Sequence, residues 1–319
     1  GARPFVFPAM GSHGGGTPEG QRSVLEHYGI SESTIGCPIR ATMEVVQVGE
    51  ALGLPVWLDR HAAEADWIGL VNRVKPHTDF KGAIESGLFK MMTIGLGKHT
   101  GAIQYHRANI HHGYETVITA VAREMLSKSR IGFGVGIVEN GYDETARIEA
   151  FNAENLEAGE RRLLKDARDW MARLPFGQID VLVVEEMGKN ISGAGMDTNV
   201  IGRPMNPHEP FPADPKILWI VALDLTDESY GNAAGIGNAD FATRRLVEKI
   251  DMKPTLINCI TACEPGAAKV PPTYETDREA IETALSCIGL TPPEKARVVR
   301  IKNTLRLVEI EASEAFLPE

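Results

Sequence analysis

The chain has 319 residues, of which 43% are hydrophobic, which is enough for one large or two ordinary domains. Its formal net charge of -10 and the lack of any basic run argue against a nucleic-acid partner. The longest apolar stretches, such as residues 217–225, are too short to span a bilayer, so no membrane partner is expected. With no secretory signal and no CxxC pair among its four cysteines, the chain is expected to be cytoplasmic with reduced thiols.

Short apolar runs alternate with helical stretches in the first half of the chain, which predicts an α/β fold with mainly parallel strands. Strands are expected at residues 4–9, 67–71 and 131–138. Helices are expected at residues 17–28 and 114–127, the first with Thr17 as N-cap and Pro18 at its first position. Since the chain opens almost directly in a strand, and a strand needs neighbours, we expect that residues upstream are missing.

The second half repeats the alternation after a long, charge-rich helical pattern at residues 151–174, which we interpret as a connector between two lobes. Strands are expected at residues 180–185, 217–225 and 255–260, helices at 240–250 and 277–288, and a closing strand pair near 297–301 and 305–309. The predicted organisation is an N-terminal catalytic and cofactor-binding lobe (1–150), a connecting helix (151–177) and a C-terminal α/β lobe (178–319). An active-site cleft is expected between the lobes.

Three segments that follow predicted strands are candidates for this cleft: the glycine turn at 11–16, the segment after Val71 and the loop at 187–216. In open α/β sheets, ligands bind beyond the carboxyl ends of the strands. The loop at 187–216 is rich in Gly and Pro and has no periodicity, and a loop of that length in a compact protein is often functional.

His13 lies in the glycine turn, between a predicted strand and a predicted helix. Flanking glycines let the backbone approach a ligand closely, and Gly14, Gly15 and Gly16 precede a helix N-terminus, which is a natural anion site. The alternative is a plain turn with a solvated histidine. The turn lacks both the Walker lysine and the dinucleotide-binding spacing.

The segment at residues 71–106 crowds His77, Lys90, His99 and His106 around two glycine-bearing turns. His77 directly follows a proline, which fixes the turn, so a neutral imidazole there could act as a general base. The alternative is a capping or surface histidine. Lys90 sits among apolar neighbours, where it could extend to solvent or serve as a desolvated amine that attaches a cofactor.

Two further candidates concern a metal and a substrate. His106 could ligate a metal such as nickel, which imidazole suits, although His111 and His112 lie close by and compete for that role. In the loop at 185–197, Lys189 could neutralise a substrate carboxylate. The alternative for this loop is a set of structural salt bridges.

Five sequence runs resemble the lactate racemase family, in order and spacing, over nearly the whole chain: PAMGSHGG (8–15), VNRVKPHTDF (71–80), ESGLFKM (85–91), GLGKHTGA (95–102) and GKNISGAGMDTNVIGR (188–203). The resemblance implies two α/β lobes with a cleft between them. It also implies a nickel-pincer nucleotide, a pyridinium-3,5-bisthiocarboxylic acid mononucleotide whose carbon and two sulfurs bind nickel.

The resemblance also implies roles for individual residues. Lys90 matches the lysine that forms a thioamide with the cofactor, and His106, sixteen residues later, matches the protein ligand of the nickel. His13 and His77 match the two histidines that act as acid and base on opposite faces of the substrate. Further cofactor contacts are expected from Gly14, Gly15, Ser86 and Gly87.

Near the substrate, Lys189 and Glu186 resemble a polar pair of the family. Glu186 stands where the founding enzymes have glutamine. This departure argues against lactate itself, because a carboxylate would repel an anionic substrate unless it is protonated or turned away. The family normally has a segment before PAMGSH that adds substrate or phosphate contacts. Its absence here agrees with an incomplete N-terminus.

The function that the resemblance implies is racemisation or epimerisation of a 2-hydroxy acid, with a sugar acid as one candidate, by hydride transfer from Cα to the cofactor and back. One alternative is a metal-dependent hydrolase that uses His13, His77 and His106 as ligands. Another is a non-catalytic protein that binds a nucleotide or an anion on the same scaffold. A homo-oligomer is possible, and His99 is left without a role.

Overall fold

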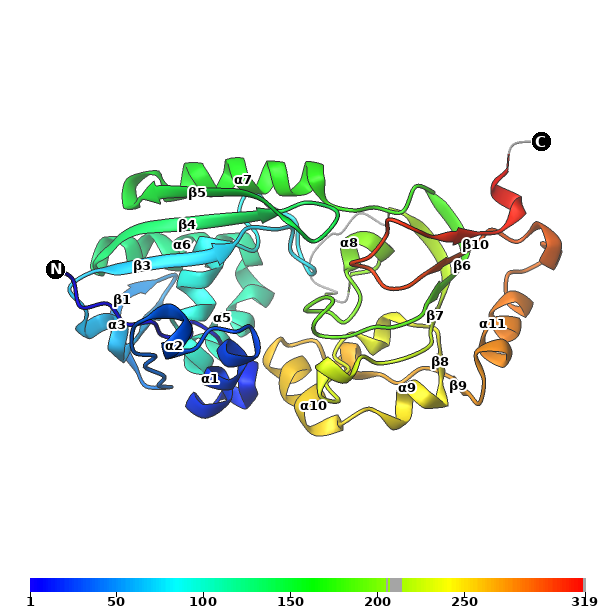
Figure 1. Ribbon diagram of the computed structural model, residues 1–319, viewed down its shortest axis with the longest axis horizontal. Helices are drawn as coiled ribbons and strands as arrows, with labels where there is room; N and C mark the ends of the chain where they lie inside the picture. The colour runs from blue at the N-terminus through cyan, green and yellow to red at the C-terminus, as the bar shows by residue number, and fades with distance from the viewer. Residues whose placement is uncertain (205, 207–213, 318–319) are drawn as a thin grey trace.

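The computed structural model describes residues 1–204, 206 and 214–317 as two α/β lobes that lie side by side (Figure 1). Each lobe has its own main hydrophobic core, with Leu70 and Ile118 in the first and Leu182 and Ile220 in the second. Most neighbouring strands in the two larger sheets run parallel. The predicted fold class is therefore confirmed.

The first lobe is built on a three-stranded sheet in which β3 and β4 are parallel and β5 is antiparallel to β4. Its strands are β1 (Val45–Ala51), β2 (Leu54–Asp59), β3 (Ile68–Arg73), β4 (Ile131–Glu139) and β5 (Thr145–Asn152). Its helices are α1 (Pro18–His27), α2 (Glu32–Ile35), α3 (Arg60–Glu64), α4 (Leu88–Lys90), α5 (Lys98–His112), α6 (Tyr114–Lys128) and α7 (Leu156–Trp170). Strands β1 and β2 form a separate antiparallel hairpin that contacts α6.

Local signals explain the elements that the sequence predicted in this lobe. The hydroxyl of Thr17 accepts a hydrogen bond from the backbone N–H of Gly20 at 3.1 Å, and Pro18 opens α1, as expected. Helix α6 buries Val117, Val121 and Met125 at four-residue spacing, which confirms the predicted amphipathic helix. Strands β3 and β4 confirm the predictions at 67–71 and 131–138.

The strand predicted at residues 4–9 is wrong. Its only strand pairing among the described residues is an isolated bridge between Val6 and Ile39. Pro4 and Pro8 lie two residues to either side of Val6 and have no N–H to donate, so the ladder cannot extend beyond Val6 in either direction. The hairpin of β1 and β2 and the strand β5 were not predicted.

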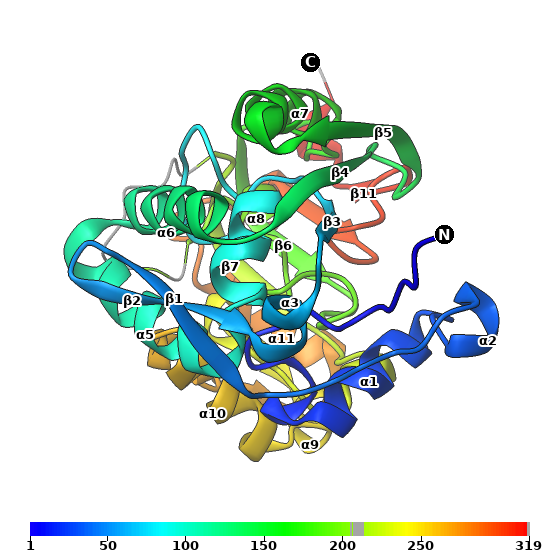
Figure 2. The same cartoon turned by 90° about the vertical axis from the view of Figure 1, so that its left-hand side faces the viewer.

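Helix α7 covers the sheet of the first lobe and then leads the chain into the second. Leu156, Leu163 and Leu164 on its buried face belong to the first core, and α7 packs on β4. In Figure 2, which looks onto the first lobe, α7 lies at the top, while α1 lies near the bottom. The long charge-rich helix is therefore part of the first lobe's core as well as the route to β6.

The second lobe contains a six-stranded sheet with the order β11-β10-β6-β7-β8-β9, parallel except for β11. Its strands are β6 (Gln178–Val184), β7 (Lys216–Ala222), β8 (Phe241–Thr243), β9 (Thr273–Tyr274), β10 (Val298–Ile301) and β11 (Glu311–Ala312). Its helices are α8 (Thr198–Ile201), α9 (Arg244–Glu248), α10 (Met252–Thr261) and α11 (Asp277–Ser286). The predicted strands at 180–185 and 217–225 and the predicted helix at 277–288 are confirmed.

Three predictions in this lobe need correction. Residues 255–260 form part of α10 rather than a strand; Asp251 caps this helix, and only Thr255 and Cys259, four residues apart, are buried on it. The predicted helix at 240–250 is divided, because Thr243 ends β8 and caps α9 through the N–H of Leu246. The partner of β10 lies at β11 rather than at 305–309.

The long loop after β6 contains the short helix α8, and residues 205 and 207–213 of this loop lie outside the described residues. Among the described residues, we find no helix that combines the length and the apolar character needed to cross a membrane.

Candidate functional site

The two lobes meet where the segments after β3 and β6 approach each other. Helix α8 of the second lobe binds the loop after β3: the hydroxyl of Thr198 donates to the carbonyl of Thr78, and the side-chain amide of Asn199 donates to the carbonyl of His77 at 3.1 Å. The predicted acid–base residue His77 is therefore held from both lobes.

His77 is 3% exposed, and its backbone and ring are both fixed. Its N–H donates to the carboxylate of Glu85 at 2.6 Å. Glu85 is fully buried and pairs with Arg168 of α7 at 2.5 Å. The imidazole packs against the ring of Phe80 with 4.5 Å between centroids. The direction of His77 is thus determined by packing and by one buried carboxylate.

The hydrogen bonds of the His77 ring identify the nitrogen that carries the proton. Burial, and then the charge of Lys90, lowers the pKa of His77 well below its usual value, so the ring is neutral. Its Nδ1 accepts a hydrogen bond from the backbone N–H of Asp79 at 3.0 Å. A neutral imidazole has one N–H, so we infer that the proton is on Nε2, which contacts Nζ of Lys90.

Lys90 ends α4 and precedes a π-helical turn, Met91–Gly95, a type of distortion that is frequent at functional sites. Burial lowers the pKa of Lys90 to about 8, although the charge of Asp79 opposes this shift. Lys90 is still mostly an ammonium at pH 7, but its neutral fraction rises, and this neutral form can accept a hydrogen bond from Nε2 of His77 and react as a nucleophile.

His106 lies on α5, and its ring meets the ring of Tyr114 edge-on at 6.1 Å. Burial, and then the charge of Lys90, lowers the pKa of His106 to about 4. Its Nδ1 is buried and has no hydrogen-bond partner among the described residues. A neutral imidazole with an unpartnered nitrogen has the chemistry of a metal ligand.

His13 lies in a 3-10 turn, His13–Gly16, that precedes α1. Its side chain is accessible to solvent, but neighbouring protein atoms and the charges of Lys189 and Lys90 lower its pKa. Lys90 belongs to the first lobe and Lys189 to the second. His13 therefore faces the junction of the lobes as a neutral imidazole.

The residues expected at the cofactor beside Lys90 are Gly14 and Gly15 in one turn and Ser86 and Gly87 in another. Gly14 has a φ of +63°, and a Cβ there would lie 2.2 Å from the backbone of Gly20, so Gly14 serves the packing of the turn against α1. Gly15 has a φ of +67° and open space around a built Cβ. The backbone of Ser86 pairs with that of Lys75, at 2.8 and 3.2 Å.

Gly87 is required by a side chain of α7. A Cβ at Gly87 would lie 2.3 Å from Oε1 of Glu160, a fully buried carboxyl whose Oε2 accepts from the N–H of Phe89 at 2.8 Å. Burial raises the pKa of Glu160 to about 8. Ser86 and Gly87 thus tie the end of β3 to α4, directly before Lys90.

The two residues expected to bind the substrate, Lys189 and Glu186, contact different parts of the second lobe. The ammonium of Lys189 donates to Asn258 of α10 at 2.6 Å and to the carbonyl of Gly193, and burial lowers its pKa to about 8. The carboxylate of Glu186 instead accepts from Asn303 at 2.8 Å and lies 4.0 Å from the ammonium of Lys302. Glu186 is therefore held by the segment after β10, while Lys189 contacts α10.

Comparison with known proteins was made at the levels of sequence and structure. No protein-family model matches the chain, and no curated protein matches it in sequence. Among solved structures, the chain is similar to the lactate racemase apoprotein from Thermoanaerobacterium thermosaccharolyticum, with a TM-score of 0.53 and 12% identity over 90% of this chain and 74% of that one. The chain has the lactate racemase fold. A Thermotoga maritima protein also matches, with a TM-score of 0.49 and 12% identity over 94% of this chain and 84% of that one.

The fold match supports the resemblance to the lactate racemase family that the sequence motifs indicated. On this lactate racemase fold, the structure brings His13, His77, Lys90 and His106 into one electrostatic cluster, since the charge of Lys90 acts on each of the three imidazoles. His99 lies beside Gly16 instead, and its Nε2 is buried without a partner among the described residues. His111 and His112 end α5 in exposed positions.

Sequence reasoning missed three groups of this cluster. Asp79 lies 3.5 Å from Nδ1 of His77, Tyr114 lies between the rings of His77 and His106, and Glu264 reaches the site from the second lobe. Asp79 carried a signal, because it stands two residues after His77 in HTDF. Glu264 carried none, since its segment shares no spacing with the histidine motifs.

The described residues contain no group of three or more His, Cys, Asp and Glu side chains that is placed to hold a metal ion. His13, His77 and His106 therefore do not form the three-histidine metal site that a hydrolase would need.

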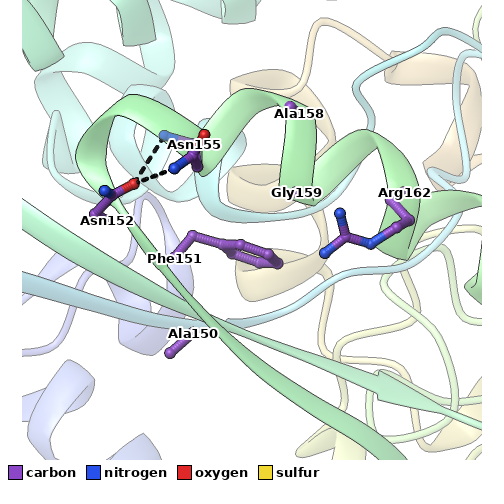
Figure 3. A pocket seen from close by; sticks show the side chains of 7 residues that line it. All are labelled: Ala150, Phe151, Asn152, Asn155, Ala158, Gly159 and Arg162. Carbon is purple, nitrogen blue, oxygen red and sulfur yellow. Dashed lines mark hydrogen bonds between the residues drawn. The ribbon is translucent and has the colours of Figure 1, made fainter.

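Two surface pockets lie apart from the cluster. One, of about 440 Å³, lies between β5 and α7 and is lined by Phe151, Asn155 and Arg162 among others (Figure 3). The other, of about 340 Å³, lies where the lobes join and includes Lys81 and Arg168. Neither pocket is lined by a predicted site residue, although Pro76 in the second pocket is adjacent to His77 in the sequence.

Proposed function

We propose that this protein is a nickel-pincer nucleotide-dependent racemase or epimerase of a 2-hydroxy acid. The observation that carries the proposal is that Lys90 contacts Nε2 of His77, while the rings of His77 and His106 both contact Tyr114. The charge of Lys90 also lowers the pKa of His13. This proximity supports the roles of tether, metal ligand and acid–base group that the resemblance implies, for residues from segments up to ninety-three residues apart (13 to 106).

The residues present fit the cofactor. Lys90 has an amine of lowered pKa that would hold the group, and His106 has a buried, unpartnered Nδ1 that would bind the nickel. When bound, the group supplies an acceptor for the hydride of the substrate Cα.

The histidines supply proton transfer to and from the substrate hydroxyl. Both His13 and His77 have lowered pKa values and are neutral near pH 7, so each can accept that proton. They come from different elements, which suits two enantiomers that present their hydroxyl groups differently. The ammonium of Lys189, oriented by Asn258, would bind the substrate carboxylate.

Nε2 of His77 can accept a substrate proton only in the tautomer that carries the ring's own proton on Nδ1. The carboxylate of Asp79, 3.5 Å from Nδ1, can accept a hydrogen bond from the proton in that position. Asp79 therefore supports the tautomer in which Nε2 has a free lone pair.

One alternative has some support. Lys75, Lys90 and Lys189 act on one another electrostatically, and three amines close together favour an anion, as a non-catalytic nucleotide- or anion-binding protein would. The hydrolase alternative lacks its three-histidine site among the described residues.

The decisive experiment uses cofactor-loaded protein and a panel of 2-hydroxy acids deuterated at Cα. Hydride transfer and return retain the deuterium in the inverted product, whereas proton abstraction would exchange it with solvent. We expect the wild type to invert the acid and retain the label. Lys90→Ala and His106→Ala should no longer invert the acid, whereas the exposed control Lys128→Ala should behave as wild type. Inversion with loss of label, or no inversion of any acid, would contradict the proposal.

A further inference from the structure

Glu264 enters the junction of the lobes from the end of α10. The N–H of Glu264 donates to the carbonyl of Cys259 at 2.9 Å, and the N–H of Cys263 donates to the carbonyl of Ile260 at 3.1 Å. This is the Schellman pattern of a helix end, with Cys263 in the left-handed position that glycine usually takes, at a φ of +61°. The backbone is strained there, and Glu264 directly follows this residue, at the end of a helix that contacts the first lobe.

The carboxyl of Glu264 is buried and incompletely paired. The residue is 9% exposed, and its Oε1 has no hydrogen-bond partner among the described residues. Its charged neighbours are Asp79 and Lys90 of the first lobe and Lys189 of its own lobe. An unsatisfied buried oxygen is costly, and one that interacts electrostatically with Asp79, Lys90 and Lys189 indicates a partner that binds there.

Among the described residues, the nearby lysines have hydrogen-bond partners other than Glu264. The amine of Lys90 contacts His77, and the ammonium of Lys189 donates to Asn258 and Gly193. Burial raises the pKa of Glu264 to about 8, so the carboxyl exists in both protonation states around neutral pH. The missing partner must therefore suit a carboxylate as well as a carboxylic acid.

We infer that Glu264 binds a hydroxyl on C3 of the substrate, so that the site prefers 2,3-dihydroxy acids to 2-hydroxy acids with an apolar C3. This inference rests on the proposed function. A hydroxyl both donates and accepts, so it pairs with Glu264 in either protonation state. A methyl group pairs with neither state, and a second carboxylate pairs only with the protonated one. Since Lys189 would bind the substrate carboxylate, the neighbouring Glu264 is placed for the substituent beside it.

Glycerate and lactate test this inference because they differ only in the C3 hydroxyl. We expect cofactor-loaded protein to bind glycerate about tenfold to a hundredfold more tightly than lactate, measured by titration calorimetry. Glu264→Met, which keeps the side-chain length, should bind both acids alike. Glu264→Gln should keep the preference for glycerate, because its amide also donates and accepts. The matched control is Glu294→Met, at an exposed glutamate in the turn Pro293–Lys295, and it should behave as wild type.

Equal affinities for glycerate and lactate in the wild-type protein would overturn the inference, and so would an unchanged preference in Glu264→Met. Nickel content per chain and thermal unfolding are measured on every variant. Loss of nickel from Glu264→Met with the preference retained would assign the carboxyl to the cofactor instead, and would also overturn it. Binding is independent of turnover: a glycerate preference without inversion of any acid would contradict the proposed function alone, whereas inversion without the preference would contradict this inference alone.

Discussion

The backbone N–H of Asp79 donates to Nδ1 of His77 at 3.0 Å, and the carboxylate of the same aspartate lies 3.5 Å from that nitrogen. One residue thus offers the imidazole a donor and an acceptor at the same atom. The donor favours the tautomer with the proton on Nε2, and the acceptor favours the tautomer with a free lone pair there. Asp79 therefore sets the balance between a resting and a basic His77.

Replacing the acceptor should slow the reaction without unfolding the protein. In Asp79→Asn the side-chain amide can donate to Nδ1, which holds the proton on Nε2, and we expect the inversion rate to fall by about 10²- to 10⁴-fold. The rate is measured on cofactor-loaded protein with each enantiomer of one acid. Asp66→Asn, at an exposed aspartate, is the control. A full rate in Asp79→Asn would remove the aspartate from the mechanism.

The buried carboxyl of Glu160 should make stability depend on pH. Burial raises its folded-state pKa from 4.5 to about 8, so between these values the native protein binds more protons than the unfolded chain. Its stabilising effect is complete below pH 4.5 and is lost as the pH rises through 8. We expect the free energy of unfolding to fall with pH more steeply in the wild type than in Glu160→Gln, by at most about 1.4 kcal/mol per pH unit.

Denaturant unfolding of both proteins at several pH values between 4.5 and 8 checks this difference. Glu154→Gln, at an exposed glutamate just before α7, should follow the wild type. Parallel curves for the wild type and Glu160→Gln would show that Glu160 is ionised in the native state.

Gly87 should tolerate no side chain, for lack of space. A Cβ there would lie 2.3 Å from Oε1 of Glu160, so Gly87→Ala must displace a buried carboxyl or the start of α4. We expect a loss of about 1–3 kcal/mol in the free energy of unfolding. Gly177→Ala meets no atom within 4 Å and should stay within about 0.5 kcal/mol of the wild type. Equal stabilities of the two variants would refute the packing argument.

A buried lysine anchors the turn that carries His13. Lys98 is fully buried, and its Nζ donates to the carbonyl of Pro8 and to Oε1 of Gln21, both at 2.5 Å. Gln21 in turn donates to the carbonyl of Gly11 at 3.0 Å. The position of His13 therefore depends on a polar chain that begins in α5.

Removing this lysine should destabilise the protein strongly. Asp59 is fully buried with its Oδ2 3.8 Å from Nζ of Lys98, and Lys98→Met would leave the aspartate without its cation. Burial shifts the pKa of each group toward its neutral form, so the desolvation cost exceeds the attraction between the two. We expect a loss of about 3 kcal/mol in Lys98→Met by denaturant unfolding, partly recovered by adding Asp59→Asn. If the double variant recovers no stability, the whole loss in the free energy of unfolding comes from the missing hydrogen bonds to Pro8 and Gln21.

Elements with local signals were predictable from the sequence. Thr17 and Pro18 mark the start of α1, and the four-residue spacing of Val117, Val121 and Met125 marks α6. The run at 255–260 failed because a short apolar stretch satisfies the pattern of a buried strand and that of a helix. Only the cap at Asp251, four residues earlier, distinguishes the two.

The candidate site was predictable only in part, because some of its residues are distant from one another in the sequence. His77, Lys90 and His106 lie within thirty residues of one another, so their crowding is visible in the sequence. Glu264 lies 158 residues beyond His106 and joins them only because α10 contacts the first lobe. Long-range packing decides such a position, and no periodicity or spacing records it.

The electrostatic potential close to Lys75, Lys90 and Lys189 has the opposite sign to the potential far from the molecule. The chain carries a formal net charge of -10, so an anion far from the surface is repelled, whereas close to the three amines it is attracted. Dissolved salt screens the distant field first, because screening grows with separation. Capture of an anionic substrate should therefore become faster as salt is added, the reverse of what a uniformly basic protein shows, and it slows again only when the salt is concentrated enough to screen the amines themselves.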